Sequence, residues 1–337
     1  MSTAILILHH KKVKLTINCL ESLKQQSTED FHIYLLVQGA EREDQITLFN
    51  LYSNWPKITI VNKEKNYGFA EGNNILIRTA LADPQTKYII TLNNDTTVDK
   101  NFVQEIIKPL TLDSDIGMVQ AEMKKMNEPN QIDCLGIELM YSGLPFNIKN
   151  YDKQNFICCP SAGAAAYSRS LLEQTKIAKQ VSSGFESRIE YDYFDSRFFA
   201  YCEDLDLGLR ARHLGFKPTL ANQAVCYHLG SATTSVMSEF AVYHTYRNLI
   251  WTLYKNLPAK TIFKLSPWII SGWTALGVNF AKKRMFKIFI RALRDAYKNL
   301  SKFTNDRRHI LSSSKLTASS IKEMLTLGIV DNDYLKY

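Results

Sequence analysis

The sequence predicts an α/β fold: a Rossmann-like, mostly parallel sheet flanked by helices, with a helical basic C-terminal extension. Two observations support this prediction. Short apolar runs rich in β-branched and aromatic residues alternate with stretches whose apolar residues recur at helical spacing. Polar and acidic side chains then follow directly after such a run, as in Leu92-Asn93-Asn94-Asp95. Open α/β sheets bind their ligands at this position, beyond the carboxyl ends of the strands.

The expected elements follow in chain order. Strands are expected at residues 4–8, 31–37, 58–61 and 87–92, and helices at 13–26, 43–53 and 70–82. Less regular patterns indicate strands at 116–122 and near 132–139 and 156–167. A helix at 204–214 should end at Gly215, because glycine commonly follows the last helical residue, and a final strand is expected at 224–228. Beyond residue 234 the pattern predicts helices at 240–257, 265–281 and 285–300.

The chain has 337 residues, which exceeds one average domain. We expect a catalytic domain over residues 1–235, which binds nucleotide over about 1–123 and acceptor over about 124–235, and an extension over 236–337. The six cysteines show no C-x-x-C pair, which suits a reducing cytoplasm. The first apolar run, residues 4–8, is too short for a secretion signal, so a cytoplasmic location is expected.

The net charge of +8 is concentrated in one segment. Residues 247–308 contain fourteen Lys or Arg against two Asp, a balance of +12 that leaves −4 for the rest. Because this excess lies on a segment rich in Trp, Phe and Ile, outside the acidic motifs, it disfavours nucleic-acid binding and favours an anionic membrane surface.

Within that segment, two helices carry the membrane hypothesis. Residues 265–281 are apolar but short for a membrane span, which predicts a re-entrant or interfacial helix. Residues 285–300 predict a basic amphipathic helix. The alternative is a helix packed on the catalytic domain with a solvated basic face.

Three motifs carry the chemistry. The first is Asn93-Asn94-Asp95, where one carboxylate can hold a hard divalent cation. The second, Glu203-Asp204, follows the aromatic run Phe198-Phe199-Ala200-Tyr201 at a predicted helix start, where an Asp is also a common helix cap. The third is the glycine- and asparagine-rich run from Asn66 to Asn74, in which glycine lets backbone approach a ligand closely.

Together these motifs resemble the inverting family 2 glycosyltransferases of GT-A fold, especially the bacterial rhamnosyltransferase-like branch, over about residues 4–230. The resemblance implies that Asp95 binds Mg²⁺ or Mn²⁺ with help from His228. It implies that Asp204 is the general base. At the predicted helix start, the helix N-terminus should keep this carboxylate ionised near neutral pH, and we expect Glu203 to orient a substrate hydroxyl. The implied donor-binding residues are Gln38, Asn66, Gly68, Gly72, Asn74, Asn93, Asn94 and Gly163.

The chain departs from the family pattern at three places. Asn93 replaces an acidic residue, and Val37-Gln38-Gly39 stands where the family has an Asp-Asn pair. Residues 177–191 form a longer connection than usual, which is either an acceptor-facing loop or surface decoration.

The resemblance implies transfer from a deoxythymidine-diphosphate-rhamnose or uridine-diphosphate-sugar type donor. The acceptor would be a lipid-linked saccharide in surface polysaccharide (lipopolysaccharide or O-antigen) assembly, at the inner face of the cytoplasmic membrane. One alternative is a nucleotidyltransferase acting on sugar phosphates, which the absence of glycine in His9-His10-Lys11-Lys12 disfavours. The other is a catalytically degenerate nucleotide-sugar-binding protein.

Overall fold

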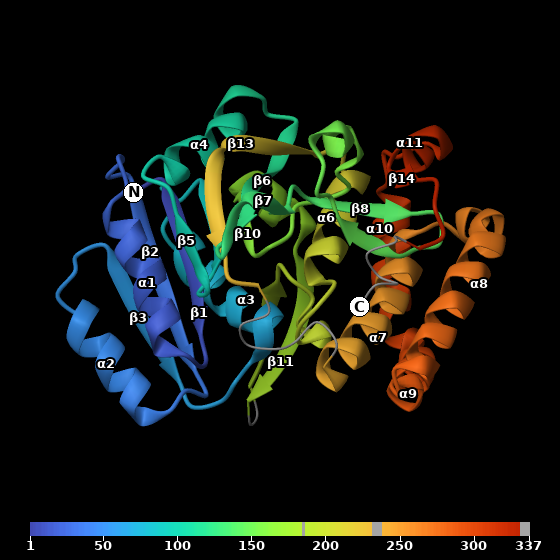
Figure 1. Cartoon of the computed structure of the whole chain (residues 1–337), viewed down its shortest axis with the longest axis horizontal. Coiled ribbons are helices and arrows are strands. Elements are labelled where there is room, and N and C mark those ends of the chain that lie inside the picture. Colours follow the sequence, from blue (N-terminus) through green and yellow to red (C-terminus); the bar gives the residue numbers. More distant parts are fainter. Residues whose placement is uncertain (184–185, 231–237, 331–337) are drawn as a thin grey trace.

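The computed structural model describes residues 1–183, 186–230 and 238–330. These residues form a central sheet with helices on both faces and a helical region beside it (Figure 1). The sheet has nine strands in the order β3-β2-β1-β4-β10-β6-β13-β5, with β7 paired to β6. Their bounds are β1 Thr3–His9, β2 Phe31–Gln38, β3 Ile58–Lys63, β4 Tyr88–Asn93, β5 Thr96–Val98, β6 Ile116–Lys125, β7 Glu128–Cys134, β10 Ala164–Ser168 and β13 Lys217–His228.

The strand directions place the ligand edge of the sheet. Strands β1 to β4 are parallel, and β13 runs parallel to β6, whereas β10 lies antiparallel between β4 and β6. The carboxyl end of β4 therefore lies beside the start of β10 and near the end of β13. This arrangement confirms the predicted mostly parallel α/β sheet.

Two hydrophobic layers hold the helices on the sheet. One contains helices α1 (Val13–Lys24), α2 (Arg42–Tyr52) and α4 (Phe102–Leu112). The other contains α3 (Gly68–Leu81), α5 (Arg169–Thr175) and α6 (Glu203–His213). This second layer continues without a break into α7 (Glu239–Asn256), α8 (Ala259–Lys282) and α9 (Phe286–Lys298). The C-terminal region thus shares a core with the helices that carry the site.

Shorter elements complete the C-terminal side. Helices α10 (Thr304–Ser312) and α11 (Ala318–Glu323) follow α9, with the 3₁₀ turn η3 (Leu300–Phe303) between α9 and α10. A small sheet joins β8 (Ile137–Met140), β9 (Pro145–Asn147) and β14 (Leu325–Thr326). Because β14 comes from the end of the chain and β8 from its middle, this sheet ties the extension to the acceptor half of the predicted catalytic domain.

Most predicted elements are confirmed within a few residues, and the differences have local causes. The strand expected at 132–139 is divided into β7 and β8 by Gly136, whose φ of 122° turns the chain. The strand expected near 156–167 is wrong in its first half. The 3₁₀ helix η1 (Tyr151–Phe156) ends at residue 156, residues 157–163 contain only an isolated bridge at Cys159, and β10 begins at Ala164. Pro160, which cannot donate to a ladder, lies between them.

The helix expected at 265–281 is longer than its apolar run. It is α8, of 24 residues, and it buries Leu265, Leu276 and Phe280 against the body of the protein. Among the residues described, no helix combines the length and apolar character that crossing a membrane requires.

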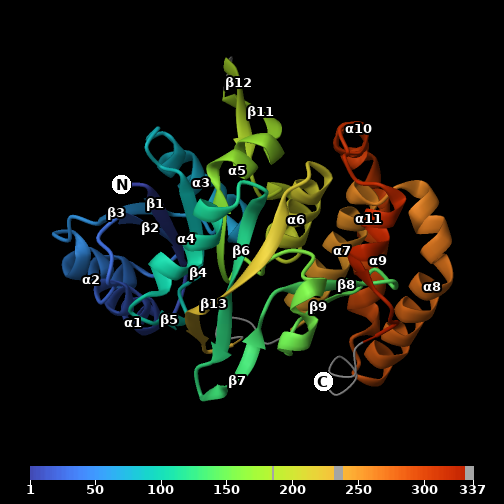
Figure 2. The same ribbon diagram turned by 90° about the horizontal axis from the view of Figure 1, so that it is seen from above.

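The long connection at 177–191 forms a β-hairpin. Strands β11 (Ile177–Ser183) and β12 (Glu186–Asp192) pair antiparallel and project from the body (Figure 2). Ion pairs of Arg78 with Glu190 and Asp192, and of Lys179 with Glu71, fix the hairpin base to α3.

A buried ion network joins α6 to α7. The Lys255 ammonium, fully buried, lies 2.6 Å from the Asp195 carboxylate and 2.9 Å from that of Asp206, and Arg210 lies 3.0 Å from Asp206. Burial pushes the pKa of Asp195 up, but the charges of Lys255 and Arg197 outweigh it and hold that pKa below its ordinary value. Asp206, two residues after the candidate base Asp204, therefore has a structural role in the protein interior.

Replacing Lys255 with Met should lower the free energy of unfolding by about 3–5 kcal/mol, because two carboxylates would stay buried without their shared cation. Urea unfolding followed by circular dichroism measures this. The control is Lys260→Met, an exposed lysine in the same region, which should cost less than about 0.5 kcal/mol. Equal effects would contradict the assigned network.

Candidate active site

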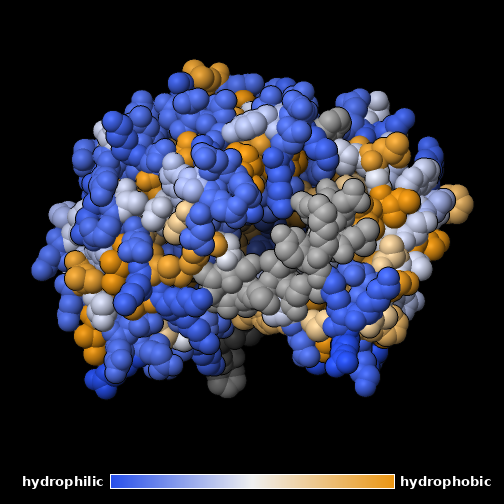
Figure 3. Space-filling view, in the orientation of Figure 1, coloured by the Kyte–Doolittle hydropathy of each residue, from blue (hydrophilic) through white to orange (hydrophobic). Residues whose placement is uncertain are grey.

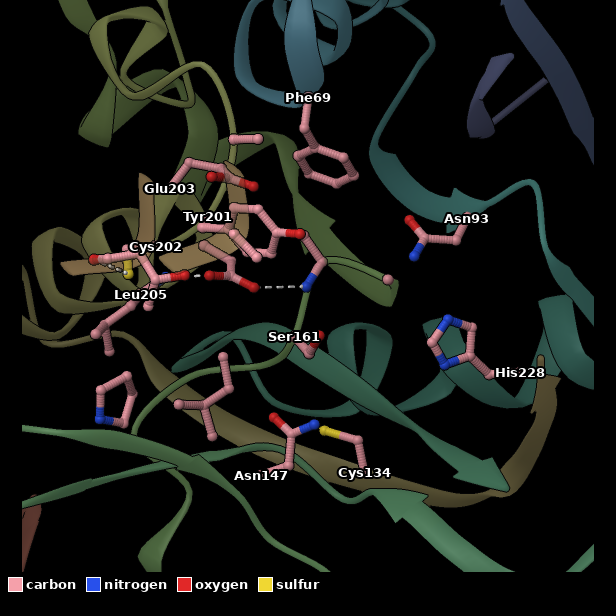
Figure 4. A pocket seen from close by; sticks show the side chains of 18 of the residues that line it. Phe69, Asn93, Cys134, Asn147, Ser161, Tyr201, Cys202, Glu203, Leu205 and His228 are labelled. Carbon is pink, nitrogen blue, oxygen red and sulfur yellow. Dashed lines mark hydrogen bonds between the residues drawn. The ribbon is translucent and has the colours of Figure 1, made fainter. Parts of the chain in front are cut away.

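A cavity of about 960 Å³ lies at the carboxyl end of β4. The molecular surface is hollowed near the centre of the view in Figure 3, and Figure 4 shows side chains that line the cavity. Asn93 and His228 lie on one side, and Tyr201, Cys202 and Glu203 lie on the other (Figure 4). The predicted site residues that line it are Gln38, Asn66, Gly68, Asn93, Asn94, Asp95, Gly163, Glu203, Asp204 and His228.

Asp95 and His228 are brought together from distant parts of the sequence. Strand β13 pairs with β5, so His228 lies opposite Thr96. His228 Nε2 is 3.4 Å from Asp95 Oδ1, and its Nδ1 is 2.7 Å from Asp133 Oδ2. A histidine held by a carboxylate at one nitrogen presents the other in a fixed direction, as metal-binding histidines commonly do.

The two carboxylates control the charge of His228. Burial lowers the pKa of its imidazole, but the hydrogen bonds and negative charges of Asp133 and Asp95 outweigh burial and raise that pKa to about 9. At neutral pH, without a metal, the His228 imidazole is thus charged. A metal ion bound by Asp95 and His228 would displace this proton.

Neighbouring residues shape the floor of the cavity. The Asn93 backbone N–H donates to the Gly163 carbonyl at 2.8 Å, which joins β4 to the start of β10. A Cβ on Gly163 would lie 3.3 Å from Asn93 Nδ2, so a larger residue would crowd that amide. The Asn94 amide donates to Thr16 Oγ1 at 2.9 Å. Gly163 thus leaves room beside Asn93.

The Asn66–Gly68 turn is built around backbone contacts. Asn66 Oδ1 accepts from the Gly68 N–H at 2.8 Å. Gln38 Oε1 accepts from the Tyr67 N–H at 2.9 Å, and its Nε2 donates to the Gly68 carbonyl at 3.1 Å. Both ends of the Gln38 amide are thus bonded to this turn. A role for Gln38 in contacting the nucleobase stays a prediction.

Two predicted donor residues do not line the cavity. The Asn74 side chain, fully buried, accepts from the Tyr193 and Phe194 N–H groups and donates to the Phe194 carbonyl. A Cβ on Gly72 would lie 3.1 Å from Gln38 Nε2 and from Leu8 Cδ1. Both positions therefore join α3 to its neighbours, and their influence on a donor would be indirect.

The Glu203–Asp204 pair begins helix α6 on the opposite wall. Asp204 accepts from the Ala162 N–H at 3.2 Å and from the Leu205 N–H at 2.8 Å. Glu203 Oε2 is buried and has no hydrogen-bond partner among the described residues. One carboxylate of the pair is thus held by backbone amides, whereas the other is left partly unsatisfied.

Burial dominates the acidity of both groups. It raises the pKa of Asp204, although the backbone donors pull that pKa down. Burial and the charge of Asp204 raise the pKa of Glu203 well above its ordinary value. The helix N-terminus alone would lower the pKa of Asp204, so the net direction is opposite to that expectation. A carboxylate whose pKa is raised is a stronger base towards an acceptor hydroxyl.

The backbone that presents this pair is strained. Phe199, Tyr201 and Cys202 have φ values of 68°, 72° and 66°, in the left-handed region that non-glycine residues avoid. Gly68, with φ of 74°, packs against this segment, where a Cβ would lie 2.4 Å from the Phe199 carbonyl oxygen. The glycine thus permits a close approach between backbone segments of this chain.

Sequence reasoning missed several residues of the cavity. Asp133 lies on edge strand β7 with no motif around it, and its role appears only through contact with His228. Part of the wall comes from the C-terminal helices: Phe240, Val242 and Tyr246 of α7, and Phe280 of α8. Among the described residues, none of the β11–β12 hairpin lines the cavity.

The fold is of the GT-A type found in glycosyltransferases. The chain belongs to glycosyl transferase family 2, whose family model matches residues 4–175. No curated protein sequence matches it.

Solved structures share this fold at low sequence identity. GalNAc-T7, determined with UDP, GalNAc and Mn²⁺, is 12% identical with a TM-score of 0.59, covering 90% of this chain and 58% of that one. The mannosyltransferase PcManGT from Pyrobaculum calidifontis, in complex with GDP-Man and Mn²⁺, is 12% identical with a TM-score of 0.54, covering 92% and 85%. TarS of S. aureus is 14% identical with a TM-score of 0.55, covering 96% and 54%. The chain thus spans little more than half of two of these proteins.

The raised pKa of His228 predicts a pH-dependent stability in metal-free buffer. The contribution of the charged imidazole is fully present below pH 6.5, the usual histidine pKa, and is lost as pH rises through about 9. The stability difference between wild type and His228→Gln should thus shrink by roughly 3 kcal/mol between pH 6 and 9.5. Urea unfolding in EDTA measures it, and a constant difference would contradict the charged state.

Proposed function

We propose that this protein is an inverting glycosyltransferase that moves a sugar from a nucleoside-diphosphate donor to a saccharide hydroxyl. The observation that carries the proposal is the placement of Asp204 on one wall of the cavity and of Asp95 with His228 on the other. Donors of the deoxythymidine-diphosphate-rhamnose or uridine-diphosphate-sugar type are proposed from the resemblance of the motifs.

In this proposal the reaction is a single displacement. Asp204 takes the proton of the acceptor hydroxyl as that oxygen attacks the anomeric carbon. The new carbon–oxygen bond forms as the bond to the diphosphate breaks, and the diphosphate leaves with its electron pair. Attack opposite the leaving group inverts the anomeric centre. Glu203 would orient the acceptor hydroxyl beside Asp204.

The residues at the β4 end fit a divalent cation. Asp95 offers a hard oxygen ligand, and His228, oriented by Asp133, offers a nitrogen. No group of three or more His, Cys, Asp or Glu able to hold a metal occurs within the described residues, so diphosphate oxygens and water would complete the coordination. When bound, Mg²⁺ or Mn²⁺ would supply stabilisation of the charge on the leaving diphosphate.

We propose a lipid-linked acceptor in surface polysaccharide assembly, reached at the cytoplasmic face of a membrane. Helices α8 and α9 expose the apolar side chains Phe263, Ile270, Val278, Phe286, Ile290 and Tyr297. Hydrophobic and hydrophilic side chains are mixed over the right-hand flank in Figure 3, where these helices lie in Figure 1. Such a face suits an interfacial helix pair on anionic lipid.

Some basic side chains of residues 247–308 make contacts inside the protein. Lys255 is buried, and Arg247 and Arg307 donate to backbone carbonyls of Phe198, Tyr254 and Leu257. The balance of +12 therefore overstates the charge available to a membrane.

Replacing Asp204 with Asn should lower the rate of sugar transfer by about 10² to 10⁴, the usual contribution of a general base, while donor affinity stays within about threefold. The assay is a nucleotide-sugar panel with Mn²⁺, followed by release of nucleoside diphosphate. Near-normal transfer by this variant would reassign the base, with Glu203→Gln as the next test. A wild type that binds a donor but never transfers or hydrolyses it would identify a degenerate binding protein.

Replacing Asp95 with Asn should weaken nucleoside-diphosphate binding about tenfold or more in Mn²⁺ and leave the residual binding in EDTA unchanged. Titration calorimetry measures both. The control is Asp99→Asn, an exposed carboxylate that directly follows β5 and does not line the cavity. Equal wild-type affinity in EDTA and Mn²⁺ would exclude the metal role.

The protein should float with anionic liposomes at low salt, and binding should weaken in salt because screening shortens the reach of each charge. Changing Lys264, Lys287 and Lys298 together to Gln should reduce binding by about 1 kcal/mol per lysine. The matched control changes Lys63, Lys65 and Lys108, which are exposed on the catalytic side. Protein that stays at the bottom of the gradient at low salt would exclude membrane attachment.

A further inference from the structure

The strained segment before helix α6 needs external support. Three non-glycine residues between positions 199 and 202 adopt left-handed φ values. Each costs of order 1–3 kcal/mol, so such a backbone persists only where surrounding contacts determine it. Because Glu203 and Asp204 follow at once, the direction in which they enter the cavity depends on this segment.

One support comes from the start of α3. The backbone N–H groups of Phe69 and Ala70 both donate to the Phe199 carbonyl, at 2.7 and 3.1 Å. These are among the first N–H groups of the helix, which lack partners within the helix itself. They fix one carbonyl of the segment. The Phe198 carbonyl also accepts from the Ala200 N–H within the segment, at 2.9 Å, and the carbonyls of Ala200 and Tyr201 accept from another element.

The second support is one side chain of α7. Asn248 is fully buried, and its Nδ2 lies 3.0, 2.8 and 2.8 Å from the carbonyl oxygens of Phe198, Ala200 and Tyr201. Arg247 Nη2 also donates to the Phe198 carbonyl, at 3.0 Å. Arg247 Nε donates to Asn248 Oδ1 at 2.9 Å, which orients the amide so that its NH₂ group faces the three carbonyls.

We propose that Asn248 is a positioning residue for sugar transfer: its amide holds the strained segment 198–202 so that Asp204 meets the acceptor hydroxyl. The inference rests on the proposed role of Asp204 as base. Asn248 is not among the residues that line the cavity, so it acts through the segment and without contacting substrate.

The chemistry of the site requires an amide here. Asp has the same shape as Asn but no N–H donor, so it would place a carboxylate against three carbonyl oxygens. The segment would then lose the hydrogen bonds that compensate for its backbone strain, and it would relax towards negative φ. A displacement of about 1 Å at a reacting group costs up to roughly 10²-fold in rate.

The test compares wild type, Asn248→Asp and Asn248→Ser with the control Tyr254→Phe. Tyr254 lies on the same helix, and its hydroxyl contacts Thr304, away from the segment. With the donor found in the nucleotide-sugar panel, Asn248→Asp should lower kcat by about 10- to 100-fold while the donor KM and nucleoside-diphosphate affinity stay within about threefold. Asn248→Ser keeps one hydrogen-bond donor, so its kcat should fall less. The kcat of Tyr254→Phe should stay within about twofold of the wild-type value.

Amide hydrogen exchange gives a second readout that needs no activity. In Asn248→Asp the peptide covering residues 196–204 should exchange at least tenfold faster, with the β1 and β2 peptides unchanged. If Asn248→Asp does not fold, Asn248→Ser carries both readouts. Unchanged exchange at 196–204 together with a kcat equal to that of Tyr254→Phe would overturn the proposal. A third outcome is that residues 196–204 exchange faster in Asn248→Asp but the wild type transfers no sugar. This would show that Asn248 supports the segment and would refute the proposed function.

Discussion

The left-handed backbone at residues 199–202 is the constraint on which the site depends. It turns the chain sharply so that helix α6 begins inside the cavity, with Glu203 and Asp204 in its first turn. The conformation is costly, and it is stabilised from two directions, by backbone N–H groups of α3 and by Asn248 of α7. The close approach of α3 in turn requires Gly68, where any side chain would meet the Phe199 carbonyl. Glycine at this position therefore permits the backbone geometry that presents the proposed base, Asp204.

The C-terminal region contributes to the site and not only to its surroundings. It supplies the buried cation Lys255, the Asn248 amide and part of the cavity wall, including Phe240 and Phe280. The same region exposes apolar and basic side chains on α8 and α9. One helical unit thus faces the catalytic centre on one side and, under the proposed function, lipid on the other. This arrangement would bring a membrane-bound acceptor towards the base without a separate anchoring domain.

Local patterns were enough to predict the sheet and the acidic walls of the site. Asp95 follows an apolar strand and Glu203 begins a helix, and both features can be recognised from the residues beside them in the sequence. Asp133 and Asn248 could not be predicted in the same way, since each gains its role from a partner about 50 to 100 residues away, at His228 or Tyr201. Gln38 has a further contact that its place in the pattern did not indicate: its amide bonds to the Tyr67–Gly68 backbone, and the nucleobase contact stays a prediction. The pKa of Asp204 likewise depends on burial, which the helix start does not reveal.

The central claim is that Asp204 activates the acceptor for a single displacement, without a covalent sugar–enzyme intermediate. The anomeric configuration of the product tests this most directly. Proton NMR of the first transfer product, made with the donor that the panel identifies, reports that configuration from the coupling at the anomeric proton or from the anomeric ¹³C–¹H coupling. The account predicts a configuration opposite to that of the donor sugar. A product that retains the donor configuration would contradict it.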